Sequence, residues 1–203
     1  IKVVNDLIED HGKLLKESEY LLEKVELTRD IIKTLQEYAS GRLITGSDGL
    51  NLVEIIETVL RIQGSNISRN EVQIVKNYSK DEKIPIVAQK VKAIHILINI
   101  VKNAIEAMDK NPLDQRIITI DIDNSNANNI VVVIKDNGEG ISEENLKKIF
   151  SFGFSSKKDG HGFGLHTCAN YMKEMGGSIR VTSEGIGKGA AFVLEFLRDN
   201  QNS

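Results

Sequence analysis

The sequence has few of the residues that cross-link or stiffen a chain, and it lacks long apolar runs. Its 203 residues include one cysteine, two prolines and no tryptophan. A single cysteine, Cys168, excludes an internal disulfide, and this composition is typical of a reduced, cytoplasmic protein. No apolar run approaches the roughly 20 residues that a membrane-spanning helix requires, so we expect no membrane segment in this chain.

An excess of charge of one sign is missing as well. The 26 basic and 29 acidic side chains leave a formal net charge of -3. Without a global positive field, the chain is not expected to bind nucleic acid or an anionic membrane surface through long-range attraction. Any anion that it binds must therefore be held by a local arrangement of groups.

Residues 2–40 contain no proline and carry apolar or small residues at alternating spacings of three and four. These residues are Val4, Leu7, Leu14, Leu21, Val25, Ile32, Leu35 and Ala39. This heptad pattern predicts a long helix that packs in a bundle, across a dimer axis. The glycine-rich segment 41–50 predicts a flexible joint after it. We therefore expect a dimerisation helix over 1–45 and a second domain over 46–203.

The second domain alternates helical and strand periodicities. Apolar spacing predicts helices over 50–63, 89–108 and 165–175, and the capping pattern SEEN predicts another that begins near residue 142. β-rich runs predict strands over 71–78, 83–88, 116–123, 129–136, 178–185 and 190–197. This order predicts an α/β (α+β) fold, a two-layer sandwich of helices on a mixed, mostly antiparallel sheet.

Asn99 and Asn103 lie four residues apart in the predicted helix over 89–108. Residues at this spacing project from the same face of a helix. Two carboxamide oxygens are suitable ligands for a hard Mg²⁺ ion alongside phosphates and waters. Two solvated asparagines on the polar side of an amphipathic helix are the alternative, and this motif alone leaves both interpretations open.

The segment DNGEGI follows a strongly apolar strand. Asp136 is predicted at the strand end, facing inward as a hydrogen-bond acceptor suited to the amino group of adenine. Gly138 and Gly140 lack Cβ atoms and would let the backbone approach a flat ligand. A simple turn is the alternative, because DNG is a common turn sequence.

A glycine-rich segment, SSKKDGHGFGL, opens the helix over 165–175. Gly160, Gly162 and Gly164 are predicted to wrap phosphates, while the helix start offers free amide hydrogens. Lys157 and Lys158 would supply positive charge for the β- and γ-phosphates. No strand leads into the segment and no GK[ST] follows, so it is neither a dinucleotide fingerprint nor a Walker loop. A solvated lysine pair in a loop remains the alternative.

The order of the motifs is more specific than any one of them. In sequence, NIVKNAIEAM, DNGEGI, IFSFGFSSK, GHGFGLH and GKGAAF resemble the N, G1, F, G2 and G3 boxes of histidine-kinase catalytic domains. The last of these, taken alone, is best explained as a hairpin turn. The resemblance covers about residues 50–197. It implies the Bergerat-type ATP fold shared with gyrase-like and chaperone ATPases, with ATP and Mg²⁺ as cofactors.

The resemblance also implies roles for single residues. Asn103 is similar to the Mg²⁺-ligating asparagine, Asp136 to the adenine-binding aspartate, and Phe150 and Phe154 to the F-box aromatics. A lid from Phe154 to Leu165 would close over the triphosphate. Its further members that would contact ATP are Lys157, Lys158, Gly160, His161, Gly162, Phe163 and Gly164.

Asn99 distinguishes a kinase from its hydrolase relatives. In gyrase-like and chaperone ATPases a glutamate at this place orients the attacking water, whereas an amide is a poor general base. The resemblance therefore implies Mg·ATP binding without fast hydrolysis, which leaves the γ-phosphate for a histidine, with Asn99 and Asn103 as the catalytic pair. Glu106 departs from some kinases, which carry a lysine at that position.

The N-terminal helix is similar to the second helix of a dimerisation and histidine-phosphotransfer hairpin. We expect the helix with the acceptor histidine to be missing, because His11 is followed by Gly-Lys and falls on the inner heptad seam. The resemblance implies a homodimer through 1–45 and onward transfer to the receiver domain of a response regulator. A gyrase-like ATPase and a non-catalytic, nucleotide-sensing module remain the alternatives.

Overall fold

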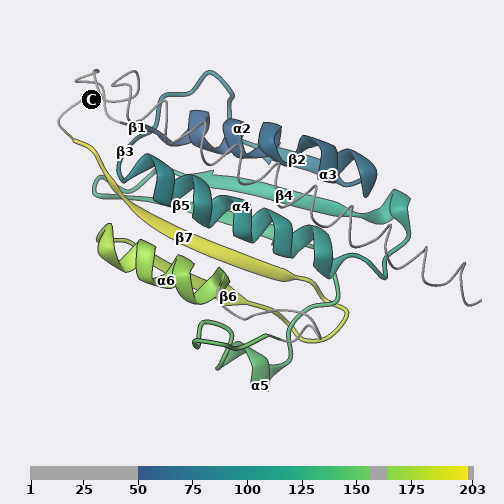
Figure 1. The fold of residues 1–203 in the computed structure, drawn as a ribbon. Coiled ribbons are helices and arrows are strands. Elements are labelled where there is room, and N and C mark those ends of the chain that lie inside the picture. Colours follow the sequence, from purple (N-terminus) through teal and green to yellow (C-terminus); the bar gives the residue numbers. More distant parts are fainter. Residues whose placement is uncertain (1–49, 156–163, 201–203) are drawn as a thin grey trace, which may run out of the picture. The chain divides into compact units, whose positions relative to one another are not determined.

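The computed structural model describes residues 50–155 and 164–200 (Figure 1). The predicted dimerisation helix over 1–45, with His11, lies outside the described residues and stays a prediction. The described elements are β1 (Leu50–Asn51), α2 (Leu52–Ile62), α3 (Gly64–Arg69), β2 (Gln73–Asn77), β3 (Pro85–Val87), α4 (Lys90–Ala107), η1 (Leu113–Gln115), β4 (Ile117–Asp123), β5 (Asn129–Asp136), α5 (Glu143–Leu146), α6 (Gly164–Glu174), β6 (Ser178–Thr182) and β7 (Ala190–Arg198). Among the described helices, none is long and apolar enough to cross a membrane.

The described strands form one seven-stranded sheet. Its order is β1-β3-β7-β5-β4-β2, and β6 also pairs with β7. Strands β2 and β4 run parallel, and the other pairs are antiparallel. The helices α2, α4 and α6 cover one face of this sheet (Figure 1). The predicted two-layer fold with a mixed, mostly antiparallel sheet is therefore confirmed.

Helix α4 is the centre of the helical layer. It contacts α2 on one side, α6 on the other and β5 beneath. Half of its 18 residues are buried apolar side chains: Ala93, Ile94, Ile96, Leu97, Ile98, Ile100, Val101, Ala104 and Ile105. Burial of one large aliphatic side chain contributes roughly 1.5–3 kcal/mol. This packing fixes the helix that carries the two predicted catalytic asparagines.

The buried, charged side chain of Arg116 holds the loop that follows α4 in place. The residue is 7% exposed. Its guanidinium donates to the carbonyl oxygens of Asp109, at 3.0 Å, and Asn111, at 3.1 and 3.2 Å, and to the Asn70 side chain at 3.3 Å. These carbonyl oxygens belong to the turn that follows α4, and as hydrogen-bond acceptors they suit the guanidinium donors. The C-terminal end of α4 is thereby tied to α3 and to the start of β4.

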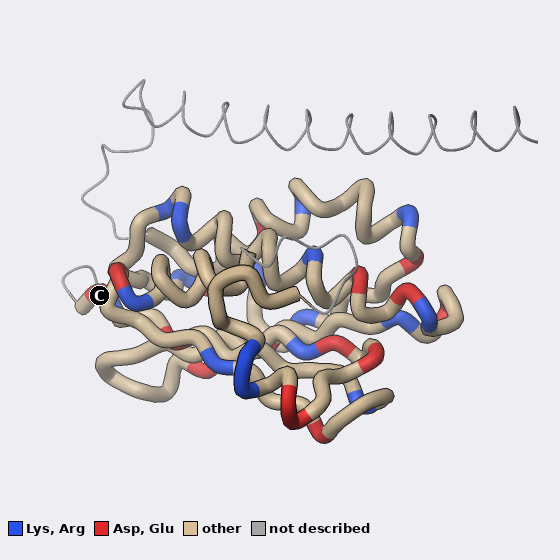
Figure 2. Tube along the Cα trace, turned by 60° about the horizontal axis from the view of Figure 1, so that its bottom comes forward, with Lys and Arg blue, Asp and Glu red and all other residues tan. Residues whose placement is uncertain are grey.

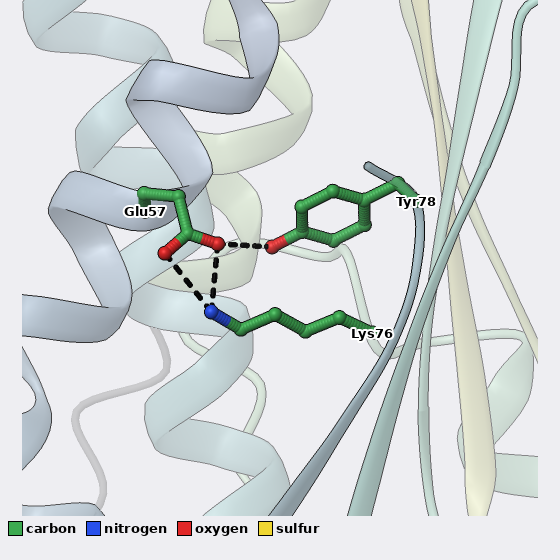
Figure 3. A network of polar contacts seen from close by, with 3 residues as sticks. All are labelled: Glu57, Lys76 and Tyr78. Atoms are coloured by element: carbon green, nitrogen blue, oxygen red, sulfur yellow. Dashed lines mark hydrogen bonds and ion pairs between the residues drawn. The ribbon is translucent and has the colours of Figure 1, made fainter. Parts of the chain in front are cut away.

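A polar network attaches α2 to the edge strand β2 (Figure 3). The Glu57 carboxylate accepts from the Lys76 ammonium at 2.7 and 2.9 Å and from the Tyr78 hydroxyl at 2.8 Å. Partial burial raises the pKa of Glu57, but the bonds from Lys76 and Tyr78 outweigh it, and the net pKa is lowered. Burial, followed by the bond to Glu57, raises the pKa of the Tyr78 phenol.

We expect Glu57→Gln to lower the free energy of unfolding by about 1 kcal/mol at neutral pH, because a partly exposed ion pair contributes little more than that. A carboxyl with a lowered pKa stabilises the fold above its ordinary pKa, and this contribution is lost as pH falls through the lowered value. Urea unfolding at neutral pH and near pH 3 should show the difference from the wild type shrinking in acid.

The exposed Glu54 on the same helix provides the control. Glu54→Gln should change the free energy of unfolding by less than about 0.5 kcal/mol at either pH. An equal loss of stability for Glu57→Gln at both pH values would contradict a role for the carboxylate charge. In that case the side chain would act through packing alone.

Candidate functional site

Asp136 is the last residue of a buried row on β5. Successive residues of a strand point to opposite faces of the sheet. Ile130, Val132, Ile134 and Asp136 therefore share one face, and all four are buried. Their shared face carries α4, with which β5 is in contact. The inward orientation predicted for Asp136 follows from this alternation.

The carboxylate of Asp136 is held on one of its two oxygens. Oδ1 accepts from the backbone N–H of Gly138 at 2.8 Å and of Ala190 at 3.3 Å, and the residue is 2% exposed. Burial raises the pKa of this carboxyl, and the two backbone hydrogen bonds act in the opposite direction. Within the described residues, both hydrogen bonds to the Asp136 carboxylate end on Oδ1. Oδ2 is therefore the oxygen that can accept from a ligand.

The loop after Asp136 docks on the C-terminal end of α4. The N–H of Glu139 donates to the carbonyl oxygen of Ala107 at 2.8 Å. A Cβ on Gly138 would lie 2.5 Å from that same oxygen, which is closer than real Cβ contacts. Gly140 has φ +70°, and a Cβ there would lie 2.1 Å from the carbonyl oxygen of Gly185. These two glycines are thus required by the packing of the chain on itself.

One line of residues along α4 connects this loop to α6. His95, Asn99, Asn103 and Ala107 are each four apart, so each lies beside the next and together they form a row that winds along the helix. A Cβ on Gly164, the first residue of α6, would lie 2.8 Å from Oδ1 of Asn99. The Asn99 amide donates to the His95 carbonyl oxygen at 2.9 Å. Asn103 is half-buried and lies one turn further along the helix than Asn99.

The two ends of this line are covered by different segments. At one end the His95 ring meets the Tyr171 ring of α6 edge to face, with centroids 5.5 Å apart. At the other end Ala107 carries the DNGEGI loop. Asn103 lies one helical turn, about 5.4 Å along the axis, from Ala107. The loop after Asp136 thus docks on the same helix that carries Asn103, and the shared site of the two side chains stays a prediction.

The remaining predicted site residues fall into two groups. Leu165 is half-buried on α6 and packs against the core, and Phe154 is half-buried in the loop after α5. No recorded contact among the described residues joins Phe154 to Asp136 or Asn103. The other lid residues lie outside the described residues and stay predictions: Lys157, Lys158, Gly160, His161, Gly162 and Phe163.

Two residues that sequence reasoning missed hold the DNGEGI loop. The Asn137 side chain accepts from the N–H of Ile117 at 3.0 Å and donates to the Gln115 carbonyl oxygen at 2.6 Å. The Ser183 hydroxyl accepts from the N–H of Ile141 at 3.0 Å. For Asn137, the local signal was an asparagine directly after the end of a strand. Nothing in the local sequence links Ser183 to residue 141.

Charges of both signs are mixed over the described part of the domain (Figure 2). Lys110 pairs with Glu139 of the DNGEGI loop at 3.1 Å, and Lys92 of α4 pairs with Glu174 of α6 at 2.6 Å. The described residues contain no group of three His, Cys, Asp or Glu side chains that could hold a metal. Asn103 could offer a neutral oxygen to a divalent cation, alongside oxygens of a bound ligand.

A family model matches residues 88–200, from the start of α4 to the end of β7. Its description is "Histidine kinase-, DNA gyrase B-, and HSP90-like ATPase". The matched range contains every element that forms the line along α4 and the loop around Asp136.

Curated relatives agree with this match. The chain is 33% identical over 141 residues to sporulation kinase C of Bacillus subtilis, which covers 70% of this chain and 32% of that protein. It is 31% identical over 146 residues to the sensor histidine kinase ZraS of Salmonella typhi, covering 71% of this chain and 30% of that protein. The chain thus spans about a third of the length of these relatives.

Solved structures show the same fold. The catalytic domain of histidine kinase ThkA superposes with a TM-score of 0.63 at 27% identity. That superposition covers 76% of this chain and 97% of the ThkA domain. The described domain is therefore similar in extent to a complete catalytic domain of that kinase.

Proposed function

Because this chain belongs to the family of histidine kinase-, DNA gyrase B- and HSP90-like ATPases, we propose that it is a protein histidine kinase of a two-component system. It binds Mg·ATP and transfers the γ-phosphate to a histidine side chain, from which the phosphate passes to an aspartate of a response regulator. The observation that carries the proposal is the line along α4, which joins Asn99 and Asn103 to the loop of Asp136.

Asp136 selects adenine in this proposal. Its Oδ1 is occupied by two backbone N–H groups, and Oδ2 accepts from the exocyclic amino group of the base. The surroundings are buried, so the bond forms in a region of low dielectric constant, where a hydrogen bond to a charged group is strong. A base that offers an acceptor at this position leaves the buried carboxylate unpaired, which disfavours its binding.

Asn103 provides a neutral oxygen ligand for Mg²⁺, beside the triphosphate. The ion would supply charge neutralisation at the β- and γ-phosphates. Gly164 and Leu165, together with the lid residues outside the described ranges, close over the phosphates. These lid residues are Lys157, Lys158, Gly160, His161, Gly162 and Phe163, and Phe154, which the structure describes, begins the lid.

Asn99 favours phosphotransfer over hydrolysis. Its amide nitrogen donates to the His95 carbonyl oxygen at 2.9 Å, which turns the Asn99 oxygen toward Gly164. An amide cannot take a proton from water at neutral pH, so the residue does not act as a general base. Water near the γ-phosphate is therefore poorly activated, and the phosphoryl group is kept for a histidine presented by another domain.

The partners follow from the same proposal. The helix over 1–45 forms a homodimer, and the acceptor histidine is brought to the nucleotide by the dimerisation domain. A receiver domain accepts the phosphate next. The protein works in the cytoplasm, where ATP and reduced thiols are available.

Incubation with γ-labelled ATP and Mg²⁺ tests this function. We expect label on a dimerisation domain with an acceptor histidine, supplied as a separate chain, and we expect that label to be acid-labile and base-stable, as phosphohistidine is. Free phosphate should be released slowly by comparison. Steady multiple-turnover phosphate release without protein label would indicate a gyrase-like ATPase instead. ATP binding in calorimetry without protein label or phosphate release would indicate a non-catalytic, nucleotide-sensing module.

A further inference from the structure

Ser183 lies where two glycine-rich segments meet. It directly follows β6, and its Oγ accepts from the N–H of Ile141 at 3.0 Å, at the end of the DNGEGI loop. The same hydroxyl donates to the carbonyl oxygen of Gly189 at 2.6 Å, at the start of β7. One half-buried hydroxyl therefore bonds to the loop that follows Asp136 and to the turn that precedes Ala190.

These two segments also touch each other through backbone alone. The N–H of Gly187 donates to the carbonyl oxygen of Glu139 at 2.6 Å, and the N–H of Gly189 donates to that of Gly138 at 3.1 Å. Glycine-rich backbone has much conformational freedom, so such contacts fix a geometry only when other groups restrain them. Ser183 is placed to provide that restraint.

One peptide unit links Ser183 to Asp136. The carbonyl group of Gly189 and the N–H group of Ala190 belong to the same planar peptide. The Ser183 hydroxyl donates to the oxygen of this peptide, and the N–H group of the same peptide, that of Ala190, donates to Oδ1 of Asp136 at 3.3 Å. The plane is thus held from both sides, and hydrogen bonds in series polarise one another.

We propose that Ser183 is a positioning residue for adenine recognition, which acts by orienting the peptide between Gly189 and Ala190 and through it the carboxylate of Asp136. This inference rests on the proposed function, because it explains the hydrogen bonds of Ser183 by the recognition of adenine at Asp136. Loss of the hydroxyl frees the peptide to rotate, weakens one of the two bonds to Oδ1, and relaxes the direction of Oδ2.

The effect should be confined to the adenine side of the site. The recorded contacts of Ser183 all lie in the DNGEGI loop and in the turn before β7. Asn99 instead contacts His95 and Gly164. A variant of Ser183 should therefore weaken binding of every adenine ligand to the same degree and leave the contribution of Mg²⁺ unchanged.

Calorimetry on the full 203-residue chain tests the inference. We expect Ser183→Ala to raise Kd by up to about tenfold for ATP, ADP and adenosine alike, since the net contribution of one hydrogen bond changes an equilibrium constant by that order. The ratio of ATP affinity with Mg²⁺ to that with EDTA should equal the wild-type ratio. Ser183→Thr retains the hydroxyl and should bind within about twofold of the wild type.

Ser178→Ala is the matched control, because Ser178 is an exposed serine at the other end of β6 that donates to Glu195 at 3.2 Å. It should bind as the wild type does. Ser183→Cys keeps the side-chain volume with weaker hydrogen bonds, and it replaces the alanine variant if that one does not fold. A lowered melting temperature with unchanged Kd would overturn the positioning role. Failure of the unaltered chain to bind ATP would overturn the proposed function itself.

Discussion

Replacing Asp136 by alanine is expected to raise the Kd for ATP by roughly 10- to 150-fold, because a buried hydrogen bond to a charged group contributes roughly 1.5–3 kcal/mol. The carboxylate is 2% exposed at the end of the buried row on β5, so water cannot replace it. Calorimetry with ATP and with adenosine should show the same loss, since the contact is to the base.

Alanine also removes the acceptor for Gly138 and Ala190, so part of its effect could come from the loop. Asp136→Asn separates the two causes. The amide oxygen still accepts from both N–H groups, while the amide nitrogen takes the place of Oδ2 and presents a donor to the base. We expect Asp136→Asn to have a melting temperature near that of the wild type and to lose as much ATP affinity as Asp136→Ala does.

The asparagine variant also makes a prediction about base preference. Inosine carries an oxygen where adenosine carries the amino group, so a donor at residue 136 suits it. The ratio of ITP affinity to ATP affinity should therefore rise above that of the wild type. Unchanged ATP affinity in Asp136→Asn would remove the adenine assignment, whatever the alanine variant does.

The sequence predicts this part of the site well because both periodicities are strong. The alternation in NIVVVIKD puts residue 136 in the buried row, and the spacing of Asn99 and Asn103 puts them on one side of α4. Each pattern spans several residues that share a face. Local periodicity therefore identifies the inward carboxylate and the line of asparagines before any contact is known.

Other features depend on contacts between distant parts of the chain. Arg116 is buried because the carbonyl groups at the end of α4 and the Asn70 side chain surround it, and an isolated arginine predicts exposure. Ser183 acquires its role only when β6 brings it beside residue 141. The two-residue strand β1 forms because Leu50 pairs with Ile86. Arg116 and Asn70, Ser183 and Ile141, and Leu50 and Ile86 are each too far apart along the chain for one short window of the sequence to contain both.

The glycines of DNGEGI illustrate a different limit. The sequence indicates that Gly138 and Gly140 permit close approach, which is correct, and it suggests a flat ligand as the approaching group. In the described structure their missing Cβ atoms make room for the carbonyl groups of Ala107 and Gly185. The residue type reveals the need for space, but only the tertiary fold identifies the group that uses it.

The second large effect is expected at Asn103. Asn103→Ala should lower Mg²⁺-dependent labelling of the supplied acceptor domain by roughly 100-fold or more, because a metal ion contributes several kcal/mol of charge stabilisation at a transferring phosphoryl group. Asn103→Asp should also fail, since its carboxylate faces the negative triphosphate. Labelling rates at saturating ATP measure both variants.

Metal dependence distinguishes loss of this ligand from general damage to α4. In EDTA, Asn103→Ala should bind ATP as the wild type does, because Asp136, which makes the proposed adenine contact, is unaltered. Adding Mg²⁺ should then improve its affinity much less than that of the wild type. Asn66→Ala, at a half-buried asparagine of α3, should behave as the wild type in both assays. Wild-type labelling by Asn103→Ala would show that the metal is held by other groups.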